Sequence, residues 1–370
     1  MRTLVISDLH LGTHSGADVL ARPEALAVLL ERLDGVDRLV LLGDTLELRH
    51  GPARDALAVA EPVIRAIGDA LGDGGEVVLV PGNHDHAIAA GWLDWRARRD
   101  VPEPLGLEER VAPERASWIA KRLGSWLSPA TVEVAYPGLW LRDDVYATHG
   151  HYLDAHVMIP TLERLSIGAL GKLVGAVGDP AVAEDYEAVL APIYALIHAS
   201  AQRANGRRTA IGKRSAVGVW TSLAGRGRAR PLRGYALAVP VRLGVYAANK
   251  AGIGPLQPDL SLSELRRCGL AAIGEVARRQ RLRPDHLIFG HTHRKGMLDG
   301  DDPREWRTPS GIQLHNAGSW VHEPIFMGRG QQGSNPYWPG NVIAVDEEGP
   351  PRLERLLADM SVRVFRPDRG

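Results

Sequence analysis

Eight side chains able to bind a metal or move a proton stand in five short segments of this 370-residue chain. They are Asp8, His10, Asp44, Asn83, His84, His149, His291 and His293. Each follows a run of residues typical of a buried strand. Imidazole, carboxylate and amide donors without a thiolate favour Mn, Fe or Zn over the all-oxygen sites that suit Ca and Mg. Any one histidine alone could be a hydrogen-bonded turn residue, but five such strand ends together predict a metal centre.

The strands that must position these residues alternate with helices. We predict strands at 2–7, 38–42, 76–80, 286–289, 314–320 and 341–346, and helices at 23–33 and 53–71. A hairpin is predicted from 131–136 and 139–148, with its turn at Pro137-Gly138. Because parallel strands end at a common edge of an α/β sheet, the site residues should meet there.

Composition excludes several classes of protein. The chain has 44 basic and 44 acidic residues, so its overall charge predicts no polyanionic partner. Cys268 is the only cysteine, which rules out an intrachain disulfide and favours a reducing compartment. Neither an apolar signal segment nor an apolar run of membrane-spanning length is found, so we expect a cytoplasmic protein.

The middle of the chain has a different character. Its first part has the spacing of amphipathic helices, and the 71 positions between Glu187 and Asp259 hold eleven Lys or Arg and no acidic residue. We expect a core of residues 1–153 and 285–370, with 154–284 as a mainly helical, basic insertion that forms a cap or lid. Taken singly, most of these basic residues are expected in a solvated loop.

The order of the site segments resembles the calcineurin-like metallophosphoesterases. The blocks that carry the resemblance are Asp8-x-His10, Gly43-Asp44-x-x-Glu47, Gly82-Asn83-His84-Asp85, His149-Gly150-His151 and Gly290-His291-x-His293. The resemblance implies an α/β fold, the four-layer αββα sandwich of that family. It also implies a dinuclear-metal-dependent phosphoester hydrolase, acting as a phosphodiesterase, pyrophosphatase or phosphomonoesterase.

The resemblance further implies a role for each residue. One metal would be held by Asp8, His10, Asp44 and His293, and the second by Asp44, Asn83, His149 and His291, with Asp44 bridging. His84 would protonate the leaving oxygen or stabilise phosphate charge, and Asp85 would hold its ring. Glu47 is expected to be a structural carboxylate beside the site. A further four residues are expected either to line the site or to lie on the surface: His14, His86, His151 and Asp154.

Two divalent ions, Mn first with Fe and Zn as alternatives, would give a metal-bridging hydroxide at neutral pH and neutralise the charge that grows on phosphate. We therefore expect direct attack by water, without a phosphoenzyme. A non-catalytic metal-binding scaffold of the same fold is the alternative. The complete set of ligands and the presence of His84 disfavour that alternative.

The motifs look most like the branch that contains UDP-diacylglucosamine pyrophosphatase, but His84 stands where the lipid enzyme commonly has Arg, and the insertion is longer. The expected substrate is therefore a phosphorylated small molecule or a lipid-linked one. The basic insertion could clamp substrate phosphates or contact an anionic membrane, so that the protein would lie at its periphery. A nuclease that holds nucleic acid through the insertion ranks lower, because no nucleic-acid-binding module is recognised.

Overall fold

The structure is a computed structural model that describes residues 1–100, 103–157, 177–203, 246, 250, 261–324, 326–327 and 333–365. Two compact units are found. The first comprises Met1–His151, His198–Asn205 and Arg283–Gly370, and the second comprises Tyr152–Ile197 and Gly206–Leu282. The assignment of 154–284 as a cap or lid stays a prediction, and nearly all of its basic stretch lies outside the described residues.

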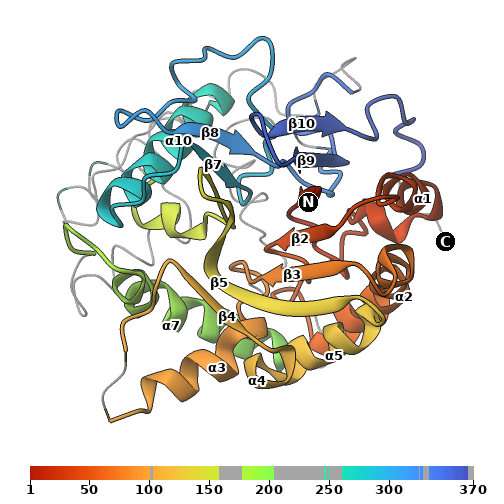
Figure 1. Cartoon of the computed structure of the whole chain (residues 1–370), viewed down its shortest axis with the longest axis horizontal. Helices are drawn as coiled ribbons and strands as arrows, with labels where there is room; N and C mark the ends of the chain where they lie inside the picture. The colour runs from red at the N-terminus through yellow and green to blue at the C-terminus, as the bar shows by residue number, and fades with distance from the viewer. Residues whose placement is uncertain are drawn as a thin grey trace. The chain divides into compact units, whose positions relative to one another are not determined.

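The strands of the described residues form one large mixed sheet (Figure 1). They are β1 (Thr3–Ile6), β2 (Arg38–Leu42), β3 (Glu76–Val80), β4 (Glu108–Val111), β5 (Thr131–Arg142), β6 (Val145–Thr148), β7 (His286–Phe289), β8 (Gln313–Asn316), β9 (Asn341–Val345) and β10 (Arg352–Arg355). Their order is β10-β9-β1-β2-β3-β5-β6-β7-β8, with β4 paired to β5. The strands β1, β2 and β3 are parallel, as are β6, β7 and β8, so each set ends its strands at a common edge.

Helices connect the strands in the pattern expected for an α/β fold, and the predicted fold class is confirmed. They are α1 (Pro23–Arg32), α2 (Ala53–Leu71), α3 (Ala87–Ala97), α4 (Pro113–Ala116), α5 (Trp118–Leu127), α7 (Ala183–Gln202) and α10 (Leu262–Arg279), with short 3-10 turns at Val19–Ala21 and His151–Ala155. Helix α2 buries one face through small and branched residues at helical spacing. It ends at Gly72, whose φ of 66° suits a glycine.

The hairpin predicted with a turn at Pro137-Gly138 is wrong. Strand β5 runs without interruption through these residues and turns only after Arg142. The strand changes partners here: its first residues pair with β3, Pro137 faces Glu108 of β4, and Gly138 onward pairs with β6. A proline is tolerated at such a change of partner because the missing N–H breaks no continuous ladder.

One apolar core joins the two halves of the sheet. It takes alternate residues from β1, β2, β3 and β9 and from β5, β6 and β7, including Val5, Val78 and Ile288. Because side chains alternate between the faces of a strand, this shared cluster means that one face of each half is turned toward the other.

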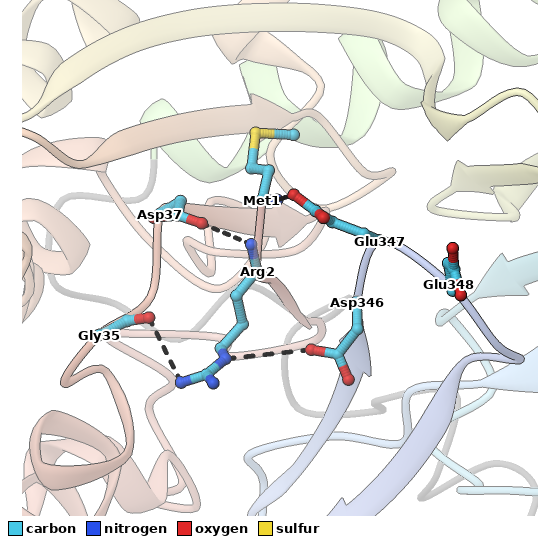
Figure 2. A pocket seen from close by; sticks show the side chains of 7 residues that line it. All are labelled: Met1, Arg2, Gly35, Asp37, Asp346, Glu347 and Glu348. Carbon is cyan, nitrogen blue, oxygen red and sulfur yellow. Dashed lines mark hydrogen bonds and ion pairs between the residues drawn. The ribbon is translucent and has the colours of Figure 1, made fainter.

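A surface hollow of about 560 Å³ lies at the opposite end of β1 from the predicted site. Figure 2 shows Arg2 between the residues that line it. The backbone N–H of Arg2 donates to Asp37 at 2.5 Å, and its guanidinium lies 3.9 Å from Asp346. The N-terminal amine pairs with Glu347. These charges satisfy one another at the starting ends of parallel strands, where α/β sheets do not place their ligands.

No helix within the described ranges is both long enough and apolar enough to cross a membrane.

Candidate metal centre

Backbone hydrogen bonds continue between the loops that follow β1 and β2. The amides of Asp8 and His10 donate to the carbonyls of Gly43 and Asp44, at 3.1 and 2.8 Å. These bonds bring the Asp8 and His10 side chains beside Asp44. On the other half of the sheet, the Gly290 amide donates to the His149 carbonyl at 3.0 Å. The predicted residues therefore meet because the ladders extend past the strand ends.

Left-handed backbone is concentrated at this place. Six non-glycine residues in the described part of the chain have positive φ, and five are predicted site residues: Asp8, His10, Asp44, His291 and His293, with φ from 45° to 65°. Such conformations cost on the order of 1–3 kcal/mol each and persist only where the surroundings impose them. The strain here turns side chains from separate loops toward a common point.

The first group of possible metal donors is Asp8, His10 and His293, whose ligand atoms lie within 4.8 Å of one another. Nε2 of His293 is 3.2 Å from Oδ1 of Asp8 and 3.0 Å from Nε2 of His10. Nε2 of His10 is in turn 3.6 Å from Oδ2 of Asp44.

The second group is Asp44, His149 and His291, with the same closeness of ligand atoms. Oδ2 of Asp44 lies 3.4 Å from Nε2 of His149. Oδ1 of Asn83 lies 3.2 Å from that nitrogen and 3.2 Å from Nδ1 of His291. Nδ1 of His149 donates to the Leu42 carbonyl at 2.9 Å, which leaves Nε2 as the donor atom for a metal. Asp44 thus stands between the two groups.

Two observations fit this cluster to cations. Oδ1 of Asp8 is buried and accepts no hydrogen bond of good geometry from any described residue. The Asn83 amide oxygen points at acceptor atoms only, and turning the amide would instead put its nitrogen 3.1 Å from Oδ2 of Asp44. Two oxygens that face each other at such a distance repel unless a cation lies between them or the amide turns. The residues therefore fit two divalent ions.

The electrostatics of the cluster agree with this fit. Burial would raise the pKa of Asp8 and Asp44, but neighbouring histidines, His293 and His149 foremost, hold both well below the ordinary value. Burial opposes a charge on His149, yet Asp44 raises the pKa of its imidazole to about 9. The carboxylates favour protonation of the imidazoles that face them. Those imidazoles would lose their protons when divalent cations bind.

Glu47 orients two imidazoles at once. Its Oε2 accepts from Nδ1 of His84 at 2.8 Å and from Nδ1 of His10 at 3.1 Å. The Glu47 side chain is buried, and its Oε1 accepts from the Arg49 amide at 2.9 Å. The sequence indicated a structural carboxylate here, and its two histidine partners are found only in the structure.

The role expected for Asp85 is wrong, because its carboxylate does not hold the His84 ring. It accepts four backbone amides instead, those of Gly82, Asp44, Thr45 and Leu46, at 2.7 to 3.2 Å. Asp85 follows β3 and the Asp44 loop follows β2, 41 residues earlier, so no local sequence pattern indicated the contact. Burial and the charge of Asp44 raise the pKa of Asp85 to about 6.

Two glycines are required by close approach. A Cβ on Gly43 would lie 2.2 Å from Nδ1 of His149, and one on Gly82 would lie 2.3 Å from Oδ1 of Asp44. Gly43 also has a φ of 85°. Because glycine has no side chain, His149 and Asp44 can pack directly against the backbone at Gly43 and Gly82.

The four residues expected either to line the site or to lie on the surface are found in different environments. His151 is buried, with its ring 5.6 Å from that of His149 and Nε2 3.3 Å from the Tyr136 hydroxyl. His86 contacts the Tyr136 ring edge to face. His14 is exposed beside His50. Asp154 is buried in the second unit.

Comparison with known proteins relates the first half of the chain to one family. The sequence model of the calcineurin-like phosphoesterase family matches residues 1–180. A dimetal phosphatase from Danio rerio is 12% identical, with 94% of this chain and 93% of that chain covered and a TM-score of 0.31. A cold-active protein-tyrosine phosphatase from a psychrophilic Shewanella is 14% identical, with 94% and 75% covered and a TM-score of 0.26. Scores this low do not themselves establish a shared fold.

His291 and His293 lie beyond the matched residues, and the sheet brings them to the same cluster. The lipid-specific branch suggested by the sequence stays a prediction. The match identifies a calcineurin-like phosphoesterase domain over residues 1–180, and this domain supports a hydrolase that acts on phosphoesters.

Proposed function

We propose that this chain hydrolyses a phosphoester by direct attack of water on phosphorus, with two divalent ions held by the clustered donors. The observation that carries the proposal is that Asp44 belongs to two groups of possible metal donors, one with His10 and His84 and one with His149 and His291. A carboxylate between two metal positions is what a dinuclear phosphoesterase requires. When bound, the ions would activate water at neutral pH and neutralise phosphate charge.

In this proposal each residue has a defined task. Asp8, His10 and His293 would hold the first ion, Asn83, His149 and His291 would hold the second, and Asp44 would contribute to both. Residues at positive φ hold these donors in place before substrate arrives, so little reorganisation is needed on binding.

His84 is the proposed acid for the leaving oxygen. Glu47 fixes Nδ1 of His84, and Nε2 has no hydrogen bond among the described residues. Burial lowers the pKa of His84 to about 4, although Glu47 opposes that shift. A phosphate beside the ring would favour its charged form, so His84 gains its proton together with substrate.

The test is hydrolysis of bis-p-nitrophenyl phosphate with added Mn, alongside Asp44→Ala and His84→Ala. Asp44→Ala should abolish activity and metal binding, whereas His84→Ala should keep the metal and lose about 100-fold or more in kcat. His286→Ala, on β7 and outside the cluster, is the matched control. Isotopically labelled water should enter the phosphate product.

If the metal-loaded wild type hydrolyses no substrate, the scaffold alternative is restored. If the phosphate product carries no label from the water, direct attack by water is rejected. Mn is the first choice of ion, with Fe and Zn to be compared in the same assay. A phosphorylated small molecule or a lipid-linked phosphate remains the proposed substrate. A cytoplasmic location with peripheral membrane contact also stays a prediction.

A further inference from the structure

A row of imidazoles leads from the metal centre toward the surface. The ring centroids of His10 and His84 are 4.6 Å apart, those of His84 and His50 are 6.4 Å apart, and those of His50 and His14 are 6.0 Å apart. His84 and His50 are half-buried, and His14 is exposed. His50 therefore lies next to the proposed acid, and the exposed His14 lies next to His50.

The backbone fixes this row. Past the strand ends, the Leu11 amide donates to the Thr45 carbonyl and the Glu47 amide donates to the Leu11 carbonyl, both at 3.0 Å. The two loops therefore run side by side as far as His14 and His50. A Cβ on Gly51 would lie 2.8 Å from Nε2 of His14, so the absence of a side chain there makes room for this ring.

The direction of the His50 ring follows from its partners. Nδ1 lies 3.3 Å from the Thr13 hydroxyl and 3.5 Å from Oε2 of Glu47, the same oxygen that fixes His84. A hydrogen on Nδ1 facing this carboxylate leaves a lone pair on Nε2. Burial lowers the pKa of His50, which favours the neutral ring.

The ring nitrogens of His50 and His14 that make no hydrogen bond could bind hydroxyl groups. Nε2 of His50 and both ring nitrogens of His14 have no hydrogen bond in the part of the chain that the structure describes. No group of three metal donors among those residues includes either histidine. An acceptor nitrogen on a half-buried ring beside the proposed acid can accept an O–H from the departing alcohol.

We propose that His50 and His14 bind hydroxyl groups of the leaving group, so that the substrate is a phosphoester of a polyol or sugar. This assignment rests on the proposed function, in which His84 faces the leaving oxygen. It makes the two histidines specificity-determining residues, outside the metal-binding set.

The test is calorimetric binding to the Mn-loaded protein of two phosphonates, 3,4-dihydroxybutylphosphonate and butylphosphonate. Their C–P bond resists hydrolysis, and they differ only in two hydroxyl groups. Wild type should bind the diol about three- to ten-fold more tightly, the range that one hydrogen bond commonly supplies. His14→Ala and His50→Phe should each bring this ratio toward one, and His286→Ala should keep it.

Equal affinities in wild type, no binding of either phosphonate, or a ratio retained in both variants would overturn the subsite. Because His14 is exposed, His14→Ala tests the idea even where His50→Phe fails to fold. Hydrolysis of bis-p-nitrophenyl phosphate is measured on the same preparations. Turnover with equal phosphonate affinities rejects the subsite alone, whereas absent turnover rejects the proposed function.

Discussion

Nδ1 of His84 donates to Oε2 of Glu47 at 2.8 Å, in place of the neighbour Asp85 that the sequence indicated. The same oxygen fixes His10 at 3.1 Å. One buried carboxylate therefore links the proposed acid to a proposed metal ligand, and a change at Glu47 acts on both.

Glu47→Gln should lower Mn affinity about 10- to 100-fold, because the amide is a weaker acceptor for Nδ1 of His10 and can present its NH₂ group there. The rate should also fall at saturating Mn, since His84 loses the same partner. Calorimetry with Mn and kcat at high Mn separate the two effects. Glu354→Gln, which removes a carboxylate paired with Arg32 at 2.7 Å, is the matched control and should change neither. Wild-type Mn affinity in Glu47→Gln would contradict the link.

Asp85→Asn should destabilise the metal-free protein by about 3 kcal/mol, because one of two oxygens that accept four backbone amides becomes a donor facing donors. Urea unfolding measures this loss. Asp144→Asn removes a carboxylate bound to Arg142 near the surface and should cost far less. If Asp85 acted mainly on the His84 ring, kcat would fall while the urea midpoint stayed constant.

Gly43→Ala should abolish metal binding, since its Cβ would lie 2.2 Å from the His149 ring. Gly72→Ala is the matched control. Gly72 also has a positive φ, 66°, yet nothing lies within 4 Å of its added Cβ. The control should cost about 1–2 kcal/mol from backbone strain and keep Mn affinity. Equal Mn binding by both variants would show that the His149 ring can move aside.

His315 should make stability depend on pH below neutrality. Burial, helped by the charge of His286, lowers the pKa of His315 to about 4 from 6.5, so between these values the unfolded chain binds more protons. Stability therefore rises with pH from about 4 to 6.5, and a shift of this size corresponds to at most about 3 kcal/mol. His315→Gln should flatten urea-derived stability across this range. Parallel curves for variant and wild type would refute the contribution.

Much of the fold was predictable because its signals are local. Strands such as Glu76–Val80 are short apolar runs with a Pro-Gly stop, and α2 repeats its apolar residues at helical spacing. Strand β5 was misjudged at Pro137, because Pro-Gly marks a turn in isolation. Strand β5 continues through Pro137 because it changes its pairing partner there. That change involves strands distant in sequence.

The sequence alone determined which chemistry is available: donors of metal-binding type at strand ends, in an order that resembles one family. Only the tertiary structure decided which donors share a neighbour. It placed Asp44 in two groups of donors, paired His84 with Glu47 rather than Asp85, and set His50 next to His84 and His14 next to His50. These contacts depend on ladder bonds between loops and on positive φ values, which no local pattern of residue types encodes.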